Sequence, residues 1–161
     1  MKSNRFLFSA VVVVLFFFTS CEKEEEVPPW AGTWASISFW NDVLELDMRV
    51  VLNLNRGTYE EIIQVMEESS SEWINYFGAK GLLEVNDNRM NVEIDEIGFS
   101  PINLVTAFPT GNIIYYLKGD DLYDKIVSDA GYITSKQLQF AISGNTLKIF
   151  IGEYQYHYEK Q

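Results

Sequence analysis

Apolar and polar residues alternate along most of the chain after residue 30, and residues 46–54 give the clearest case. The apolar positions of this segment are Leu46, Met48, Val50, Leu52 and Leu54. A period of two places these five side chains on one face of a β-strand and the intervening residues on the other. Residues 55–57, Asn-Arg-Gly, then favour a turn, and residues 58–66 contain the β-branched and aromatic residues of a return strand.

The same pattern continues to the C-terminus. Further strands are predicted at residues 73–77 and 81–85 (one strand or a bent pair, broken by Gly78 and Gly81), 90–94, 113–118, 134–142 and 146–158. Residues 98–111 contain Pro101 and Pro109 and are predicted to form a loop. The first strand begins near Trp34, which brings the total to about eight strands.

Residues 119–130 differ, because Leu122, Ile126 and Val127 recur at helical spacing. Asp120 and Asp121 stand where a helix N-terminus favours acidic residues, and Gly131 can end the helix. We therefore expect one short helix that covers an opening of the sheet.

About eight sequential strands with short connections and one apolar face must bury that face. They can close on themselves as an antiparallel up-and-down barrel, which is our prediction, or stack as the two sheets of a β-sandwich, which is the alternative. Of the 161 residues, 47% are hydrophobic and 15% aromatic, which is sufficient for the core of one domain. The net charge of −11 argues against a nucleic-acid-binding surface or one that attracts anionic lipids.

The N-terminus has the composition of a secretion signal. Lys2 and Arg5 precede an almost continuous apolar run at residues 6–18, which is short for a membrane span. The only cysteine of the chain, Cys21, follows directly after Ser20. We interpret residues 1–20 as a signal peptide, and the domain behind it can form no disulfide within the chain.

The residues before Cys21, Phe18-Thr19-Ser20, resemble the lipobox of bacterial lipoproteins, although the family usually has Leu where Phe18 stands. The resemblance implies cleavage between Ser20 and Cys21 and a lipid anchor on Cys21; the alternatives are an uncleaved signal anchor or a cysteine that stands there by chance. The acidic and proline-rich residues 21–29 form a tether that is similar to the export signal of surface lipoproteins in Bacteroidetes-type bacteria. The expected location is the outer membrane, facing the cell surface, with a periplasm-facing anchor as the alternative.

The segment Gly32-Thr33-Trp34 resembles the Gly-x-Trp motif in the first strand of lipocalins, and residues 30–161 look like the lipocalin-like domains of Bacteroidetes lipoproteins. The resemblance implies an eight-stranded barrel in which Gly32 and Trp34 belong to the plug of the closed end. In lipocalins an Arg late in the chain also stacks on this tryptophan, and here only Lys148 or Lys160 could take its place. Lipocalins have a further helix after the last strand, whereas this sequence ends within a few residues of Tyr158.

No constellation of catalytic residues stands out in the sequence. The only histidine, His157, falls on the polar face of the last predicted strand, where we expect it to be exposed. Acidic pairs such as Glu60-Glu61 are explained as polar strand faces, and Asp120-Asp121 as a helix start, although a carboxylate-based hydrolase stays open on their number alone. We therefore expect no enzyme, no cofactor and no metal site.

Aromatic residues are the more promising candidates for binding. The candidate ligand or surface contacts are Trp40, Trp73, Tyr154, Tyr156 and Tyr158. The expected function is to bind a small apolar or amphipathic molecule inside the barrel. The alternative is an interaction module whose barrel is filled by its own side chains and whose outer face binds a glycan or a partner protein.

Overall fold

The computed structural model describes residues 26–67 and 71–161. The predicted signal peptide at residues 1–20, its cleavage between Ser20 and Cys21, and the first part of the tether lie outside the described residues. Within the two described ranges, no helix combines the length and apolar character needed to cross a membrane.

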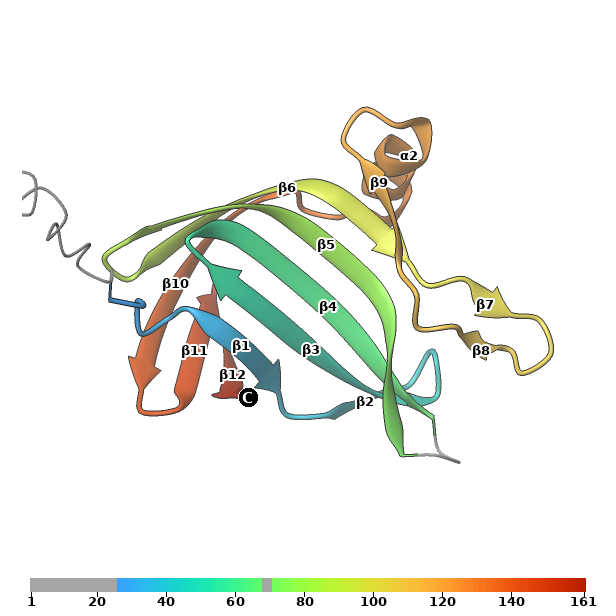
Figure 1. Cartoon of the computed structure of the whole chain (residues 1–161), viewed down its shortest axis with the longest axis horizontal. Helices are drawn as coiled ribbons and strands as arrows, with labels where there is room; N and C mark the ends of the chain where they lie inside the picture. Colours follow the sequence, from blue (N-terminus) through green and yellow to red (C-terminus); the bar gives the residue numbers. More distant parts are fainter. Residues whose placement is uncertain (1–25, 68–70) are drawn as a thin grey trace, which may run out of the picture.

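The described part of the chain forms a closed barrel of eight antiparallel strands (Figure 1). The barrel strands are β1 (Gly32–Ser36), β3 (Leu46–Asn55), β4 (Gly57–Glu67), β5 (Glu72–Asn86), β6 (Arg89–Phe99), β10 (Ser135–Ser143), β11 (Thr146–Ile151) and β12 (Tyr154–Lys160). Each strand pairs with its neighbour in this order, and β1 closes the ring by pairing with both β3 and β12. The predicted lipocalin-like up-and-down barrel is therefore confirmed over the β-sandwich.

Within the described residues, five short elements do not belong to the ring of eight strands. They are β2 (Phe39–Asn41), the hairpin of β7 (Ile102–Asn103) and β8 (Phe108–Pro109), β9 (Ile114–Leu117), and α2 (Asp121–Ala130). Strand β6 pairs first with β10 and then, from Glu96 to Phe99, with β9. Helix α2 follows β9 in the chain and lies next to it (Figure 1). The buried Tyr123 of this helix donates a hydrogen bond from its hydroxyl to the carbonyl oxygen of Ile94 on β6 at 2.8 Å.

Helix α2 forms close to where its periodicity predicts it. It ends at Gly131, whose φ of 62° is left-handed and therefore suits glycine. Asp121 lies in the first turn of the helix, as predicted, whereas the side chain of Asp120 accepts a hydrogen bond from the amide of Leu117 at 2.9 Å and makes none to the helix. Asp120 thus closes the turn that precedes the helix.

Of the two alternatives predicted for residues 73–85, one strand or a bent pair, the structure confirms one strand, and the breaks predicted at Gly78 and Gly81 are wrong. Gly78 and Gly81 do not break the chain, because β5 runs without interruption across both. A Cβ at position 81 would collide with the backbone of Glu93 on β6, at a point where the register of the two strands shifts. Glycine here permits a close approach of two backbones and a bend in the strand.

The predicted strand at residues 146–158 is in fact the hairpin of β11 and β12. Gly152, with φ of 60°, and Glu153 form its turn. The predicted loop at residues 98–111 likewise contains the small hairpin of β7 and β8.

The tight turns between β3 and β4, β5 and β6, and β10 and β11 all lie at one end of the barrel, together with the start of β1. Trp34 packs near this end with 0% of its surface exposed, and its indole nitrogen donates to the carbonyl oxygen of Trp30 at 2.9 Å. The Nζ atom of Lys160 lies 5.2 Å from the ring centroid of Trp34, so Lys160, and not Lys148, is the cation that lies over this tryptophan. The plug role of Gly32 and Trp34 stays a prediction.

Candidate functional site: a cavity inside the barrel

A cavity of about 870 Å³ lies inside the barrel. Its walls come from β3, β4, β10, β11 and β12 and from the chain that leaves β1. The buried side chains that line it are Leu52, Tyr59, Leu138, Ile149 and Tyr158. Because these residues also belong to the core cluster, the cavity extends from the opening of the barrel down to its packed core.

The cavity opens at the barrel end opposite the tight turns. Ile37 lines it but is 71% exposed, and Ile133 and Ile151 are exposed lining residues as well. The pairing of β12 with β1 begins only at Ser36 opposite Tyr158. Upstream of that pair, Tyr156 borders the opening at the edge of β12, together with the polar Gln155 and His157.

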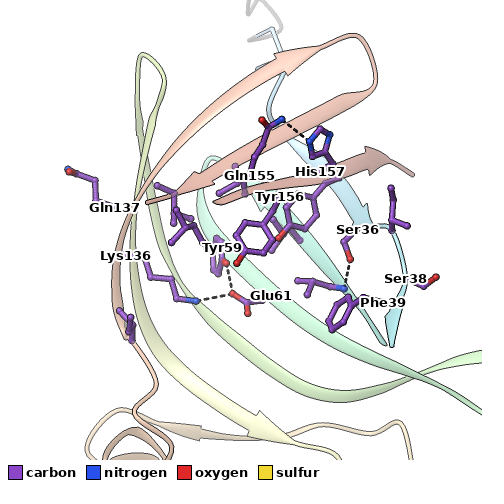
Figure 2. Close-up of a pocket in the computed structure, with 18 of the residues that line it drawn as sticks. Ser36, Ser38, Phe39, Tyr59, Glu61, Lys136, Gln137, Gln155, Tyr156 and His157 are labelled. Atoms are coloured by element: carbon purple, nitrogen blue, oxygen red, sulfur yellow. Dashed lines mark hydrogen bonds and ion pairs between the residues drawn. The ribbon is translucent and has the colours of Figure 1, made fainter. Parts of the chain in front are cut away.

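Where β1 leaves the wall, a side chain replaces the lost backbone partner. The last register pair of β1 with β3 is Ala35 with Val51, and the hydroxyl oxygen of Ser36 then accepts a hydrogen bond from the amide of Val50 at 2.9 Å. Val50 and Ser36 both line the cavity, and Figure 2 shows the hydroxyl of Ser36 with this bond. This bond gives the backbone amide of Val50 a hydrogen-bond acceptor at the opening of the cavity without covering that opening.

A cluster of polar side chains lies on the otherwise apolar wall. Oε2 of Glu61 accepts a hydrogen bond from the hydroxyl of Tyr59 at 2.7 Å and from Nζ of Lys136 at 2.9 Å (Figure 2). Lys136 also donates to the hydroxyl of Tyr132 at 3.1 Å. The side chains of Lys136 and Glu61 are 18% and 16% exposed, so this ion pair is largely withdrawn from bulk water.

The ion pair spans the inside of the barrel. Glu61 stands on β4 and Lys136 on β10, and β5 and β6 lie between these strands in the wall. Glu61 is two residues from Tyr59 and Lys136 two residues from Leu138, and both neighbours are buried, so alternation directs the two charged residues inward. The pair therefore joins two wall segments that are not adjacent.

Burial and charge fix the protonation of this cluster. Burial lowers the pKa of Lys136, but Glu61 and the hydroxyl of Tyr132 outweigh it, and the net shift is upward. Burial, and then the charge of Glu61, raises the pKa of Tyr59 well above its ordinary value, and the same two causes raise the pKa of Tyr158. At neutral pH Lys136 is therefore an ammonium group, and the phenols of Tyr59 and Tyr158 are neutral.

The neighbouring acid Glu60 belongs to the other face of the wall. It accepts a hydrogen bond from the amide nitrogen of Asn53 at 2.7 Å and lies 3.7 Å from Nζ of Lys80. Alternation separates its carboxylate from that of Glu61 by the thickness of the sheet. The two carboxylates therefore do not face a common space.

The five predicted contact residues divide into different environments. Tyr156 and Tyr158 line the cavity, so the tyrosine face of β12 points into the barrel and not outward. Tyr154 is 72% exposed beyond the lining, and Trp40 is exposed on β2. The ring of Trp73 lies 4.5 Å from the guanidinium carbon of Arg49, which covers one of its faces.

His157 is exposed, as its polar neighbours indicated, and stands at the rim of the cavity. Its Nε2 lies 2.7 Å from Nε2 of Gln155. In residues 26–67 and 71–161, no group of three or more histidine, cysteine or acidic side chains is placed to hold a metal ion.

Sequence reasoning missed Glu61 and Lys136, although a signal was present. Glu61 falls on the apolar face of its strand with Tyr59 and Val65, and Lys136 falls on the face of Leu138. A charged residue at an inward position of an alternating strand requires a partner or a ligand. The sequence pattern instead suggests a polar strand face for Glu61, because the adjacent Glu60 conceals the alternation.

Comparison with protein-family models and with curated proteins finds no match to this chain. Fold and site together define a closed, lipocalin-like β-barrel with a cavity of mostly apolar lining and an internal ion pair.

Proposed function

We propose that this protein binds a small apolar or amphipathic molecule inside its barrel, without chemical conversion. The observation that supports the proposal is the cavity of about 870 Å³, which runs from buried core residues to a rim with exposed isoleucines. Ligand sites for small molecules have volumes of roughly 300–1,000 Å³, with mostly apolar walls and a few placed polar groups. The cavity has this composition, with the Glu61 and Lys136 pair as its polar element.

We further propose that the protein is a lipoprotein held by Cys21 at the outer membrane and facing the cell surface. The lipobox-like residues before Cys21 and the acidic tether behind it support this location. The first described residues enter β1 at the barrel end that contains the tight turns, whereas the cavity opens at the other end. If Cys21 is anchored, the opening of the cavity would therefore lie at the end of the barrel that is remote from the tether.

A bulky residue inside the cavity tests the binding proposal. Val50→Trp introduces an indole that projects from β3 into the cavity, and Gln139→Trp adds the same group to an exposed, non-lining position on β10 as a matched control. The measured quantity is the fluorescence of the neutral probe N-phenyl-1-naphthylamine on titration into the full-length protein, held in an amphipathic polymer.

We expect saturable uptake by the wild type and by Gln139→Trp, and at least a tenfold weaker affinity for Val50→Trp. Circular dichroism confirms that each variant is folded. Equal affinity of Val50→Trp and the wild type would contradict binding in the barrel.

The second candidate function is an interaction module that uses the outer surface. It is favoured by the connection between β7 and β8, where Leu104 is 95% exposed and Val105 is nearly as exposed. This function predicts binding of a protein partner that Leu104→Asp abolishes and Val50→Trp leaves intact. Binding in the barrel predicts the reverse dependence, so the same two variants separate the two functions.

A further inference from the structure

The polar cluster inside the cavity has unused hydrogen-bonding capacity. Oε2 of Glu61 is engaged by Tyr59 and Lys136, but Oε1 accepts no hydrogen bond from any residue that the structure describes. Lys136 uses two of its three N–H groups, on Glu61 and Tyr132. One acceptor and one donor of this pair are therefore left to a molecule in the cavity.

Tyr158 offers a further group next to this pair. Its ring is buried and lines the cavity, and within the described ranges its hydroxyl makes no hydrogen bond. Glu61 lines the same cavity, and its charge contributes to raising the pKa of this hydroxyl. The hydroxyl of Tyr158 can donate to or accept from a ligand in the cavity.

The charge of the cluster restricts what can bind there. Lys136 and Glu61 cancel each other at 2.9 Å, and the surrounding phenols are neutral at pH 7. A ligand carboxylate would add a second anion beside Glu61, and a ligand ammonium would add a second cation beside Lys136. In a site with little water, each would leave one uncompensated charge.

Hydrogen-bond chemistry leads to the same restriction. A carboxylate has no donor for Oε1 of Glu61, and an ammonium has no acceptor for Tyr158 or Lys136. A hydroxyl group has both. We propose that the cavity takes an apolar chain that ends in an uncharged hydroxyl, which donates to Glu61 and accepts from Tyr158 or Lys136; this inference rests on the proposed function.

Three probes of equal chain length test the inference. 1-Tetradecanol, tetradecanoate and tetradecylammonium each compete with N-phenyl-1-naphthylamine for the full-length protein in an amphipathic polymer at pH 8. We expect the alcohol to displace the probe at a concentration at least tenfold lower than either ion. Equal displacement by all three, or tetradecanoate as the best competitor, would overturn the head-group inference and leave the proposed function standing.

Two charge variants then reverse the preference. Glu61→Gln leaves the cation of Lys136 and should make tetradecanoate the best competitor, whereas Lys136→Met leaves the anion of Glu61 and should favour tetradecylammonium. Glu60→Gln removes a carboxylate from the opposite face of the same strand and should keep the alcohol first. An unchanged order in both folded charge variants would contradict recognition by this pair.

The double variant Glu61→Gln with Lys136→Met covers the case in which a single variant does not fold. It keeps a neutral site with an amide acceptor, and the alcohol should again be the best competitor. A loss of this preference in the double variant would contradict the inference. Absence of probe uptake by the wild type would overturn the proposed function itself, and the inference with it.

Discussion

Nζ of Lys136 lies 2.9 Å from Oε2 of Glu61, although 75 residues separate them in the chain and two strands separate them in the barrel wall. The bond places an ion pair beside the buried apolar side chains Leu52, Leu138 and Ile149 of the cavity wall. It therefore contributes both to the stability of the barrel and to the chemistry of its cavity.

Removal of one partner of this pair should destabilise the protein. Lys136→Met leaves Glu61 without its cation in a largely buried position, and we expect a loss of roughly 1–3 kcal/mol in the free energy of unfolding by urea. The double variant with Glu61→Leu should lose less than the sum of the two single variants, since no charge is left unpaired.

The outer pair provides a control for this prediction. Lys80 and Glu60 lie 3.7 Å apart, and the lysine side chain is 39% exposed. Lys80→Met should cost no more than about 1 kcal/mol. A cost for Lys136→Met no greater than that for Lys80→Met would show that the inner pair has no special role.

Stability should decrease as the pH rises above about 10. The pKa values of Tyr59, Tyr132 and Tyr158 are raised above the ordinary value of 10.0, first by burial and then by Glu61. Above pH 10 the unfolded chain loses these protons while the folded chain retains them, so the free energy of unfolding falls. The raised pKa of Lys136 acts in the same direction above 10.5.

Urea midpoints measured between pH 8 and pH 11 test this dependence. Tyr158→Phe removes one of the titrating phenols and should make the decrease less steep. A midpoint that stays constant or rises above pH 10 would contradict the burial of these hydroxyls.

Gly81→Ala should be much more damaging than substitution of a turn glycine. The added methyl group would collide with the backbone of Glu93, which cannot move without breaking the pairing of β5 and β6. Gly144→Ala meets no atom within 4 Å and carries only the strain of a φ of 59°, about 1–2 kcal/mol. Thermal unfolding should show the larger loss for Gly81→Ala; similar losses would mean that the two strands can separate at this bulge.

Cys21→Ser should release the protein from the membrane. With the predicted lipid anchor absent, the protein should move from the detergent phase to the aqueous phase in a phase-partition experiment. Inhibition of the lipoprotein signal peptidase should likewise yield a precursor of higher mass from the wild type. Continued detergent partition of Cys21→Ser would rule out the anchor.

The sequence was sufficient for the barrel, because alternation in segments such as β3 and the spacing of turn residues report local geometry. The sequence did not show whether a glycine lies within a strand or in a turn between two strands. Gly81 lies at a register shift inside the continuous strand β5, whereas Gly152 forms the turn between β11 and β12, and apolar and polar residues alternate on both sides of each glycine. The pairing of Glu61 with Lys136 depends on barrel closure and strand register, and no local pattern contains that information. What the pattern did contain was the inward position of each residue.

Native mass spectrometry of the full-length protein, released from its membrane and compared with Val50→Trp, is the most direct test of the proposal that the barrel binds a small molecule in its cavity. The wild type should retain one small apolar molecule per chain, and Val50→Trp should retain none. A wild-type protein that shows only its own mass, both as isolated and after incubation with 1-tetradecanol, would contradict the proposal.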